Sequence, residues 1–412
     1  MPLLRRPRHL APERRTLESV RPLELYFDLV FVLGFTQCTA LMHENPTWEG
    51  VAHGLLVLAV LWWSWAGFSW LTSVVDPEEG PVRIAMFASM AALLIVAVSV
   101  PEAFGDRALA FAISYGVVRL GYAALYLLAS RDDPELRRSV MGVVPTSAIS
   151  TTVLLLVASL LDGVAQGAVW AIAIVIDGFI PARRGLAGWR LIPAHFAERH
   201  NLVIILALGE SIVALGIGAE VGLTAGVITA AALGIGLASA LWWIYFDLVS
   251  LVTQLRLARA EPGIERNALA RDSYTYLHLP MVAGIVMVAF GLEESLAHVD
   301  EHLHTVPAFA LLGGIALYLL AHVVMRLRNA GSVSVRRLVV ACLMLALWPV
   351  AMEVSALAIL AVVNVVLWAL IVIETRSYGE SRYRFRHGLE VEIPSRGGGS
   401  QGEPGLLRPS SG

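Results

Sequence analysis

The feature that most limits what this chain can fold into is a succession of apolar runs, each long enough to cross a lipid bilayer. A run of about 18 or more mostly apolar residues predicts a transmembrane helix. Hydrophobic residues make up 57% of the chain and charged residues 15%, against about 25% charged residues in a typical soluble domain. The predicted fold class is therefore all-α, a polytopic membrane bundle of about 12 transmembrane helices. The predicted spans are residues 23–43, 52–75, 82–100, 107–129, 138–161, 163–181, 194–217, 222–251, 273–292, 305–327, 335–352 and 354–375.

The positions of the basic side chains predict the topology. The chain has no Lys, so all 30 basic side chains are Arg. By the positive-inside rule, the segments that carry these arginines are cytoplasmic. Both termini are then cytoplasmic, which requires an even number of helices. Arginines recur in residues 131–138, 183–190, 256–271 and 326–337, whereas residues 43–49, 161–166, 218–222 and 293–304 hold none, and Arg107 is the exception.

The predicted organisation is two membrane repeats between two tails. Three short sequences occur twice in the same order: Leu61-Trp-Trp with Leu241-Trp-Trp, Ala124-Leu-Tyr-Leu-Leu-Ala with Ala316-Leu-Tyr-Leu-Leu-Ala, and Trp170-Ala with Trp368-Ala. They predict a duplication of six plus six helices, with residues 23–181 as the first repeat and residues 182–375 as the second. Because each repeat has an even number of helices, the halves are expected to be parallel and related by an axis along the membrane normal. Residues 1–22 form an Arg-rich cytoplasmic tail, and residues 376–412 are predicted to be a disordered cytoplasmic tail.

Ionisable side chains inside the predicted spans are the candidate functional residues, because charge within a bilayer is costly. Five of them are expected to lie at one depth near the predicted cytoplasmic face: Glu24, Asp28, His195, Glu198 and Arg199. Arg199 is expected to contact Glu24 or Asp28. Simple salt bridges at the membrane interface are the alternative for these five. Arg119 and Glu210 lie deeper: if they pair, Glu210 is expected to stay ionised, and if Arg119 is not nearby, Glu210 is expected to be protonated. The candidates for a solute or ion path are Glu24, Asp28, Arg119, His195, Glu198, Arg199, Glu210 and His278.

A metal site is a weaker hypothesis. His298, His302 and His304 lie with several carboxylates in one predicted outer loop, and imidazole and carboxylate groups suit a divalent ion. Without thiols or a defined ligand spacing, a solvated polar loop is the preferred interpretation. No phosphate loop, nucleophile elbow or zinc-protease motif is found. The sequence therefore predicts no cofactor and no nucleic-acid partner.

Three of these segments carry a resemblance to a known family. Glu24-Leu-Tyr-Phe-Asp28-Leu-Val-Phe-Val, His195-Phe-Ala-Glu198-Arg199-His200 leading into Ala207-Leu-Gly-Glu210-Ser211, and His278-Leu-Pro280-Met are similar to motifs of the bacterial low-temperature-requirement protein A family. The resemblance extends from about Arg21 to Thr375. It implies a multi-pass protein of the bacterial inner membrane associated with growth in the cold. It implies no substrate and no catalytic residue.

Three functional classes stay open at this point. The leading hypothesis is a transporter or channel for a small solute or ion, because few deep charges are spread over several helices of a duplicated bundle. A membrane-embedded enzyme or lipid-handling protein is the second, because an enzyme would gather acid and base groups at one depth. A structural or sensory scaffold is the third. The chain is expected not to be an enzyme, its partners are the lipid bilayer and the unknown solute, and the sequence does not indicate its oligomeric state.

Overall fold

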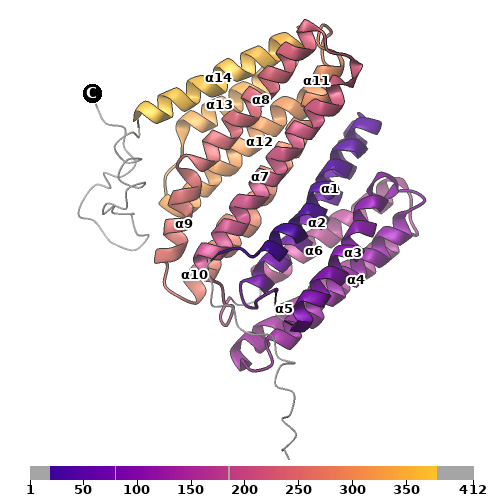
Figure 1. Ribbon diagram of the computed structural model, residues 1–412, viewed down its shortest axis with the longest axis vertical. Coiled ribbons are helices and arrows are strands. Elements are labelled where there is room, and N and C mark those ends of the chain that lie inside the picture. The colour runs from indigo at the N-terminus through magenta and orange to yellow at the C-terminus, as the bar shows by residue number, and fades with distance from the viewer. Residues whose placement is uncertain (1–18, 79, 184–185, 378–412) are drawn as a thin grey trace, which may run out of the picture. The chain divides into compact units, whose positions relative to one another are not determined.

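A computed structural model describes residues 19–78, 80–183 and 186–377 of the chain. These residues are almost entirely helical, and the extended pairing among them is a single bridge between His302 and Ser355. The long helices are drawn in Figure 1. Their bounds are α1 (Pro22–Glu44), α2 (Trp48–Thr72), α3 (Gly80–Ser99), α4 (Ala108–Ala129), α5 (Pro134–Ala158), α6 (Gly163–Arg183), α7 (Pro193–Gly218), α8 (Ala225–Phe246), α9 (Val249–Arg259), α10 (Ile264–Leu269), α11 (Leu277–Ala297), α12 (Thr305–Ala330), α13 (Val335–Ala351) and α14 (Ala356–Ser377), with short 3-10 turns at Val100–Glu102 and Ala219–Val221.

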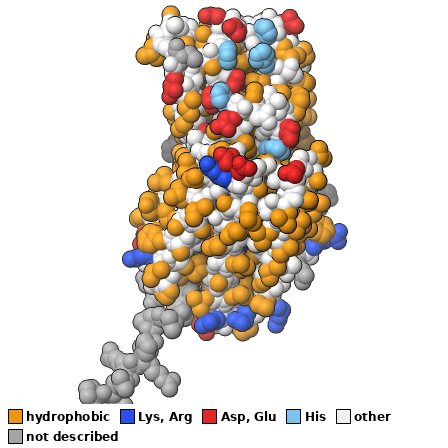
Figure 2. Space-filling view, turned by 90° about the vertical axis from the view of Figure 1, so that its right-hand side faces the viewer, with side chains coloured by type: hydrophobic (Ala, Val, Ile, Leu, Met, Phe, Trp, Pro, Cys, Tyr) orange, Lys and Arg blue, Asp and Glu red, His pale blue; other side chains and the backbone are white. Residues whose placement is uncertain are grey.

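The predicted all-α membrane architecture is confirmed. Within the described residues, eleven helical segments are long and apolar enough to cross a membrane. The remaining predicted span coincides with α13, which has 17 residues and so lies at the lower limit of roughly 17 residues for a transmembrane helix. Figure 2 shows a broad hydrophobic surface on one face, with arginines gathered at one end of it.

Two predicted spans differ from the observed helices. The span predicted at 222–251 is two helices, because the chain leaves helical geometry at Leu248 (φ −139°) between α8 and α9. The span predicted at 273–292 is also longer than expected. It begins with α10, continues through a π-helix at Ala270–Tyr276 and runs on as α11 to Ala297.

The π-helix has a cause in the sequence. Pro280 lies inside α11, where it cannot donate a hydrogen bond and its ring would clash with the carbonyl four residues earlier. That carbonyl belongs to Tyr276, the last residue of the π-helix. The Ser273 carbonyl in this π-helix accepts a hydrogen bond from Nδ1 of His278 at 3.0 Å. A π turn of this kind often marks a functional position.

The helices sort into two compact units, whose boundary falls inside α7 between His200 and Asn201. Of the described residues, unit 1 comprises 19–45, those within 49–200, and 261–268, and unit 2 comprises 46–48, 201–260 and 269–377. In unit 1, α4 packs between α3 and α5, and α5 packs on α6. In unit 2, α12 packs between α11 and α13, and α14 packs on α8.

Each unit has its own kind of core. In unit 1 the core is aromatic: Phe27, Phe31 and Phe35 line the buried face of α1, and the Phe27 ring lies 4.6 Å from that of Phe68. In unit 2 the core depends on close backbone approach. A Cβ at Gly284 would lie 2.6 Å from the Gly314 carbonyl, so α11 and α12 pack at glycines, as small residues allow between membrane helices.

Candidate functional site: a buried ion cluster in unit 1

The start of α1 fixes the first carboxylate of the site. Pro22 occupies the first turn of the helix, where its missing N–H costs nothing. The Arg21 backbone N–H donates to Oε2 of Glu24 at 2.8 Å, which holds that side chain against the helix end. The Arg21 guanidinium in turn contacts Asp76 at 2.6 Å, and this hydrogen bond raises the pKa of Arg21 above its usual range.

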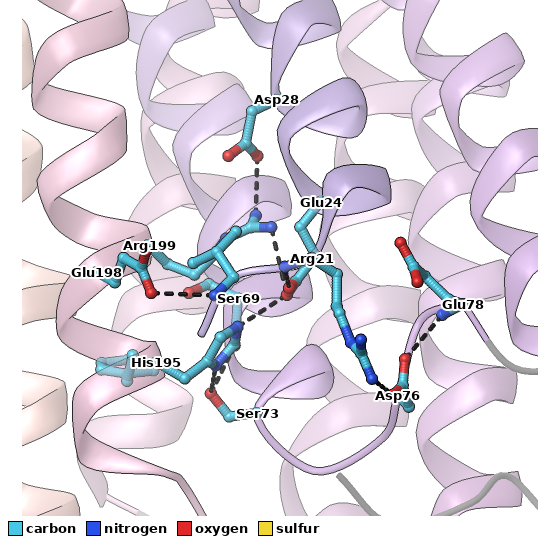
Figure 3. Close-up of polar contacts among 12 residues, drawn as sticks. Arg21, Glu24, Asp28, Ser69, Ser73, Asp76, Glu78, His195, Glu198 and Arg199 are labelled. Carbon is cyan, nitrogen blue, oxygen red and sulfur yellow. Dashed lines mark hydrogen bonds and ion pairs between the residues drawn. The ribbon is translucent and has the colours of Figure 1, made fainter. Parts of the chain in front are cut away.

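Four charged side chains meet in the interior of unit 1 (Figure 3). Glu24 and Asp28 lie one turn apart on α1, and His195 and Arg199 lie one turn apart on α7; each is at most 1% exposed. Arg199 contacts Asp28 at 2.8 Å and Glu24 at 3.5 Å, and His195 contacts Glu24 at 2.9 Å. The predicted contact between Arg199 and the α1 carboxylates is confirmed. We call these four residues the buried ion cluster.

Formal charges in the buried ion cluster do not balance without a proton. Counted over these four described residues, two carboxylates face one guanidinium, which leaves one excess negative charge when the imidazole is neutral. An uncompensated charge inside a bilayer costs at least about 2.5 kcal/mol. A second proton on His195 makes the sum zero. Glu24 also faces the Arg199 guanidinium and accepts from the Arg21 N–H, so the His195 imidazole is one place in the cluster that can hold this proton.

Ser73 of the segment after α2 lets His195 gain or lose this proton while keeping both of its contacts. The Ser73 hydroxyl lies 3.1 Å from Nδ1 of His195 and 3.1 Å from the Ser69 carbonyl. When His195 is doubly protonated, Nδ1 donates to Ser73, whose own proton goes to Ser69. When His195 is neutral, the hydroxyl rotates and donates to Nδ1, while Nε2 still donates to Glu24. A serine hydroxyl serves as donor or acceptor without moving its oxygen.

Asp28 keeps one oxygen available inside the cluster. Its Oδ1 accepts from Nε1 of Trp65 at 3.0 Å and from Arg199. Its Oδ2 is buried and has no hydrogen-bond partner among the described residues. Buried polar atoms of proteins are nearly always paired, so this oxygen is the place where the cluster can accept a further proton or a small cation.

Glu198 lies outside the buried ion cluster, although it was expected within it. It is exposed, and its Oε2 accepts from the Val20 backbone N–H at 3.0 Å. One helical step from Arg199 turns a side chain by about 100°, so Glu198 faces away from the cluster. Its contact holds the segment that precedes α1.

Arg119 has a carboxylate partner within unit 1. Arg119 is 3% exposed and pairs with Asp177 of α6 at 2.7 Å, and both contact Ser147 of α5. The carboxylate partner that the structure gives to Arg119 is thus Asp177 and not Glu210. Position along a helix does not reveal which neighbouring helix a side chain faces. Glu210 itself is buried, at 1% exposure, in the part of α7 that belongs to unit 2.

His278 takes part in a separate polar network in unit 2. Because its Nδ1 donates to the Ser273 carbonyl, its Nε2 is an acceptor in the neutral ring, and Tyr245 Oη lies 2.8 Å from it. Asn201 lies 2.9 Å from the same hydroxyl. His278 is thus held by α7, α8 and the π-helix, and the structure assigns it to a different unit from Glu24 and His195.

The histidines of residues 298–304 were the candidate metal ligands. His302 and His304 have ring centroids 6.2 Å apart. Within the residues that the structure describes, no group of three or more His, Cys, Asp or Glu side chains is placed to hold a metal ion. Three residues of the site, Trp65, Ser73 and Asp177, were missed from the sequence because Trp and Ser are common in membrane helices and Asp177 lies near a helix end.

The fold and the cluster define the class of the protein: a polytopic helical membrane protein with fully buried ion pairs. The chain matches the family described as bacterial low temperature requirement A protein over residues 19–372, and it belongs to that family. It is 30% identical over 308 residues to an uncharacterized protein of Rhizobium meliloti (strain 1021), which covers 72% of this chain and 74% of that one. No solved structure matches the chain.

Proposed function

We propose that this protein moves a small solute or ion across the bacterial inner membrane and that the buried ion cluster binds the proton coupled to that movement. The observation that carries the proposal is the charge imbalance of Glu24, Asp28, His195 and Arg199 at full burial. A cluster with one dissociable proton has two charge states. Membrane proteins use buried ionisable groups of this kind as proton relays and coupling sites.

The proposal includes an exchange at Asp28. When His195 releases its proton, the cluster gains one negative charge, which a cation at Asp28 Oδ2 would neutralise. Proton and cation would then compete for the same excess charge. An uncharged solute would instead be coupled through the rearrangement of Ser73 and His195. In this proposal both termini and the Arg-rich segments are cytoplasmic, so the cluster exchanges its proton near that face.

Reconstituted vesicles test the proposal. Purified protein is placed in liposomes that contain a pH-sensitive dye, and a panel of inorganic cations, amino acids, sugars and polyamines is added outside. We expect at least one solute to change the internal pH. Asp28→Asn should abolish this change, because it removes the excess negative charge. Glu135→Gln, which alters an exposed carboxylate at the start of α5, is the matched control and should behave like the unmodified protein.

Two results would contradict the proposal. One is a panel in which no solute moves protons in the unmodified protein. The other is a solute-dependent proton flux that Asp28→Asn leaves unchanged.

A second candidate function rests on one specific observation. Ser73, His195 and Glu24 form a hydroxyl–imidazole–carboxylate chain with contacts of 3.1 and 2.9 Å, which is the arrangement of an activated serine nucleophile. A membrane-embedded hydrolase would use it. Ser73 is only 3% exposed, which favours the proton-binding function. Labelling of Ser73 by a fluorophosphonate probe would support the hydrolase, whereas equal labelling of unmodified protein and Ser73→Ala would exclude it.

A further inference from the structure

The buried ion cluster has two net-neutral forms, which place the exchangeable proton on different residues. In one form His195 is doubly protonated, and Glu24 and Asp28 are ionised. In the other form His195 is neutral and Asp28 is a protonated acid, with its O–H on Oδ2, which has no hydrogen-bond partner among the described residues. Arg199 is cationic in both, so the formal charges of the four residues sum to zero in each form. Net charge therefore does not select one form, and local hydrogen bonds do.

Glu24 is the less favourable carboxylate for the proton, because donors reach both of its oxygens. Its Oε2 accepts from the Arg21 backbone N–H at 2.8 Å, and its Oε1 lies 2.9 Å from Nε2 of His195 and 3.5 Å from Arg199 (Figure 3). Hydrogen bonds to a charged group stabilise the charged form. Asp28 has its donors on one oxygen only, so Asp28 is the carboxylate that competes with His195 for the proton.

The indole of Trp65 is the neutral donor to that carboxylate. Among the described residues, Oδ1 of Asp28 accepts from Nε1 of Trp65 at 3.0 Å and from Arg199 at 2.8 Å. The Trp65 ring is buried, with the rings of Trp62 and His200 at 5.0 and 4.9 Å between centroids. An indole N–H bonds an ionised oxygen about twice as strongly as a neutral one. The contact therefore favours the form in which Asp28 is ionised.

The charged groups around Asp28 keep the same charge in both forms. Arg199 contacts it from α7. Arg21, at the start of the same helix, is paired with Asp76. The helix α3 also packs on α1, and its charged residue, Arg83, is exposed. Burial disfavours an ionised carboxylate, and Arg199 supplies the charge that makes either form neutral. The indole contact is thus the part of the site that acts on the position of the proton alone.

We propose that Trp65 is a positioning residue, whose indole N–H keeps Asp28 ionised and thereby keeps the exchangeable proton on His195. This inference rests on the proposed binding of a proton by the buried ion cluster. With the proton on His195, Oδ2 of Asp28 stays bare for the cation that the proposed exchange requires. A proton on Asp28 would occupy that oxygen. Trp65 therefore keeps the position of the proton apart from the position of the cation.

Trp65→Phe tests this inference, because it removes the N–H and keeps a buried aromatic ring. The full chain with labelled histidines is placed in nanodiscs, at a pH where both ring nitrogens of His195 are protonated in the unmodified protein. The ratio of the two forms should shift about tenfold or more toward the protonated acid, the loss of one charged hydrogen bond. One His195 nitrogen should then lose its proton in nitrogen-15 NMR, and infrared difference spectra should show a protonated carboxylic acid. That band should be absent from Trp65→Phe/Asp28→Asn.

Two further proteins make the test independent of packing. Trp170→Phe is the matched control, since Trp170 is a buried tryptophan of unit 1 that packs on Phe104; it should leave the His195 signals unchanged. Benzothienylalanine in place of Trp65 has the shape of tryptophan and a sulfur atom instead of the N–H. It should reproduce the result of Trp65→Phe, and it replaces that variant if Trp65→Phe does not fold.

The outcomes separate this inference from the proposed function. A His195 that stays doubly protonated in both Trp65 variants would overturn the inference and leave the proposed proton binding intact. An acid band that persists in Trp65→Phe/Asp28→Asn would also overturn it, because the proton would then be on another carboxylate. Unmodified protein in which neither His195 nor Asp28 takes up a proton at any pH would contradict the proposed function itself.

Discussion

Arg199 illustrates how a single residue holds the site together. Its guanidinium faces both carboxylates of the buried ion cluster, Asp28 at 2.8 Å and Glu24 at 3.5 Å. It also lies over the ring of Trp65, 5.7 Å from the centroid, and a cation in this position is attracted by the aromatic face. A buried pair is worth little more than an apolar replacement, but removing one member leaves a charge without compensation.

Removing Arg199 should therefore destabilise the protein through the charges left behind. Arg199→Met is expected to lower the free energy of unfolding by about 3–5 kcal/mol. The double variant Arg199→Met/Asp28→Asn should recover most of that loss, because one of the two unpaired carboxylates is gone. Thermal unfolding in detergent measures both. Additive losses in the double variant would mean that Arg199 does not act through Asp28.

At the scale of single residues, the sequence predicts the charged members of the buried ion cluster and misses the neutral residues Ser73 and Trp65, as well as Asp177, which pairs with Arg119. Glu24, Asp28, His195 and Arg199 stand out because charge is rare in membrane helices. Ser73 and Trp65 do not, since nothing in their spacing distinguishes them from packing residues. The sequence left the partner of Arg119 open, because the partner depends on which helices are neighbours, and the structure shows it to be Asp177.

Among the secondary-structure elements, the π-helix before α11 is the one most closely tied to a candidate residue. It ends four residues before Pro280, and its geometry lets His278 donate to the carbonyl of Ser273, five residues earlier. The sequence analysis predicted a regular helix at residues 273–292 and did not predict the π-helix, although Pro280 indicated an irregular turn before it. A proline inside a hydrophobic run changes the hydrogen bonding of the preceding turn as well as its own.

Pro280→Ala should leave the stability of the protein unchanged or raise it, while it lowers activity. Alanine permits regular α-helical bonding, and proline in a helix interior is about 3 kcal/mol less favourable than alanine. We expect unfolding to occur at an equal or higher temperature, while the His278 contact with Ser273 is lost and activity falls. Hydrogen exchange of residues 270–280 reports the change in backbone bonding. A variant with faster exchange and lower stability would show that the π turn is required for folding instead.

For the whole molecule, the internal duplication stays a prediction, and the two units offer one new argument for it. In unit 1, Arg119 bonds Asp177 of α6 and the Trp63 carbonyl of α2. In unit 2, Arg337 bonds Glu374 of α14 and the Ile244 carbonyl of α8. Trp63 and Ile244 lie in or directly after the repeated Leu-Trp-Trp sequence, and both acids follow the repeated Trp-Ala sequence. In each half an arginine thus joins the sixth helix to the second, although Arg119 lies on the fourth helix of its half (α4) and Arg337 on the fifth of its half (α13).

If the two halves arose by duplication, removing the corresponding carboxylate from each half should destabilise the protein by a similar amount. Asp177→Asn and Glu374→Gln each leave a buried arginine without its carboxylate, so each should destabilise the protein by about 3–5 kcal/mol. Thermal unfolding of the two variants measures this. A large loss at one position with none at the other would count against equivalent roles. In an experimental structure, Trp62 should superpose on Trp242 when the halves are rotated about an axis near the membrane normal.

The topology is a second prediction for the whole molecule. Reporter fusions at Gly222 and His298 should indicate the outside, and fusions at Gly263, Gly331 and after Ser377 should indicate the cytoplasm, because arginines flank the second set. The fusion after Ser377 decides whether the 17-residue α13 crosses the membrane. An outside signal there would make the number of crossings odd and place the termini on opposite sides.

Nitrogen-15 NMR of His195 tests most directly the claim that the buried ion cluster holds one exchangeable proton. Protein with labelled histidines is placed in lipid nanodiscs, the signals of His195 are assigned by comparison with His195→Gln, and the pH is varied. We predict that both ring nitrogens become protonated as the pH falls and that Nε2 or Nδ1 loses its proton as the pH rises. In Asp28→Asn the remaining charges already balance, so one nitrogen should stay bare at pH values where the unmodified protein is doubly protonated. Identical His195 titrations in the two proteins would contradict the account.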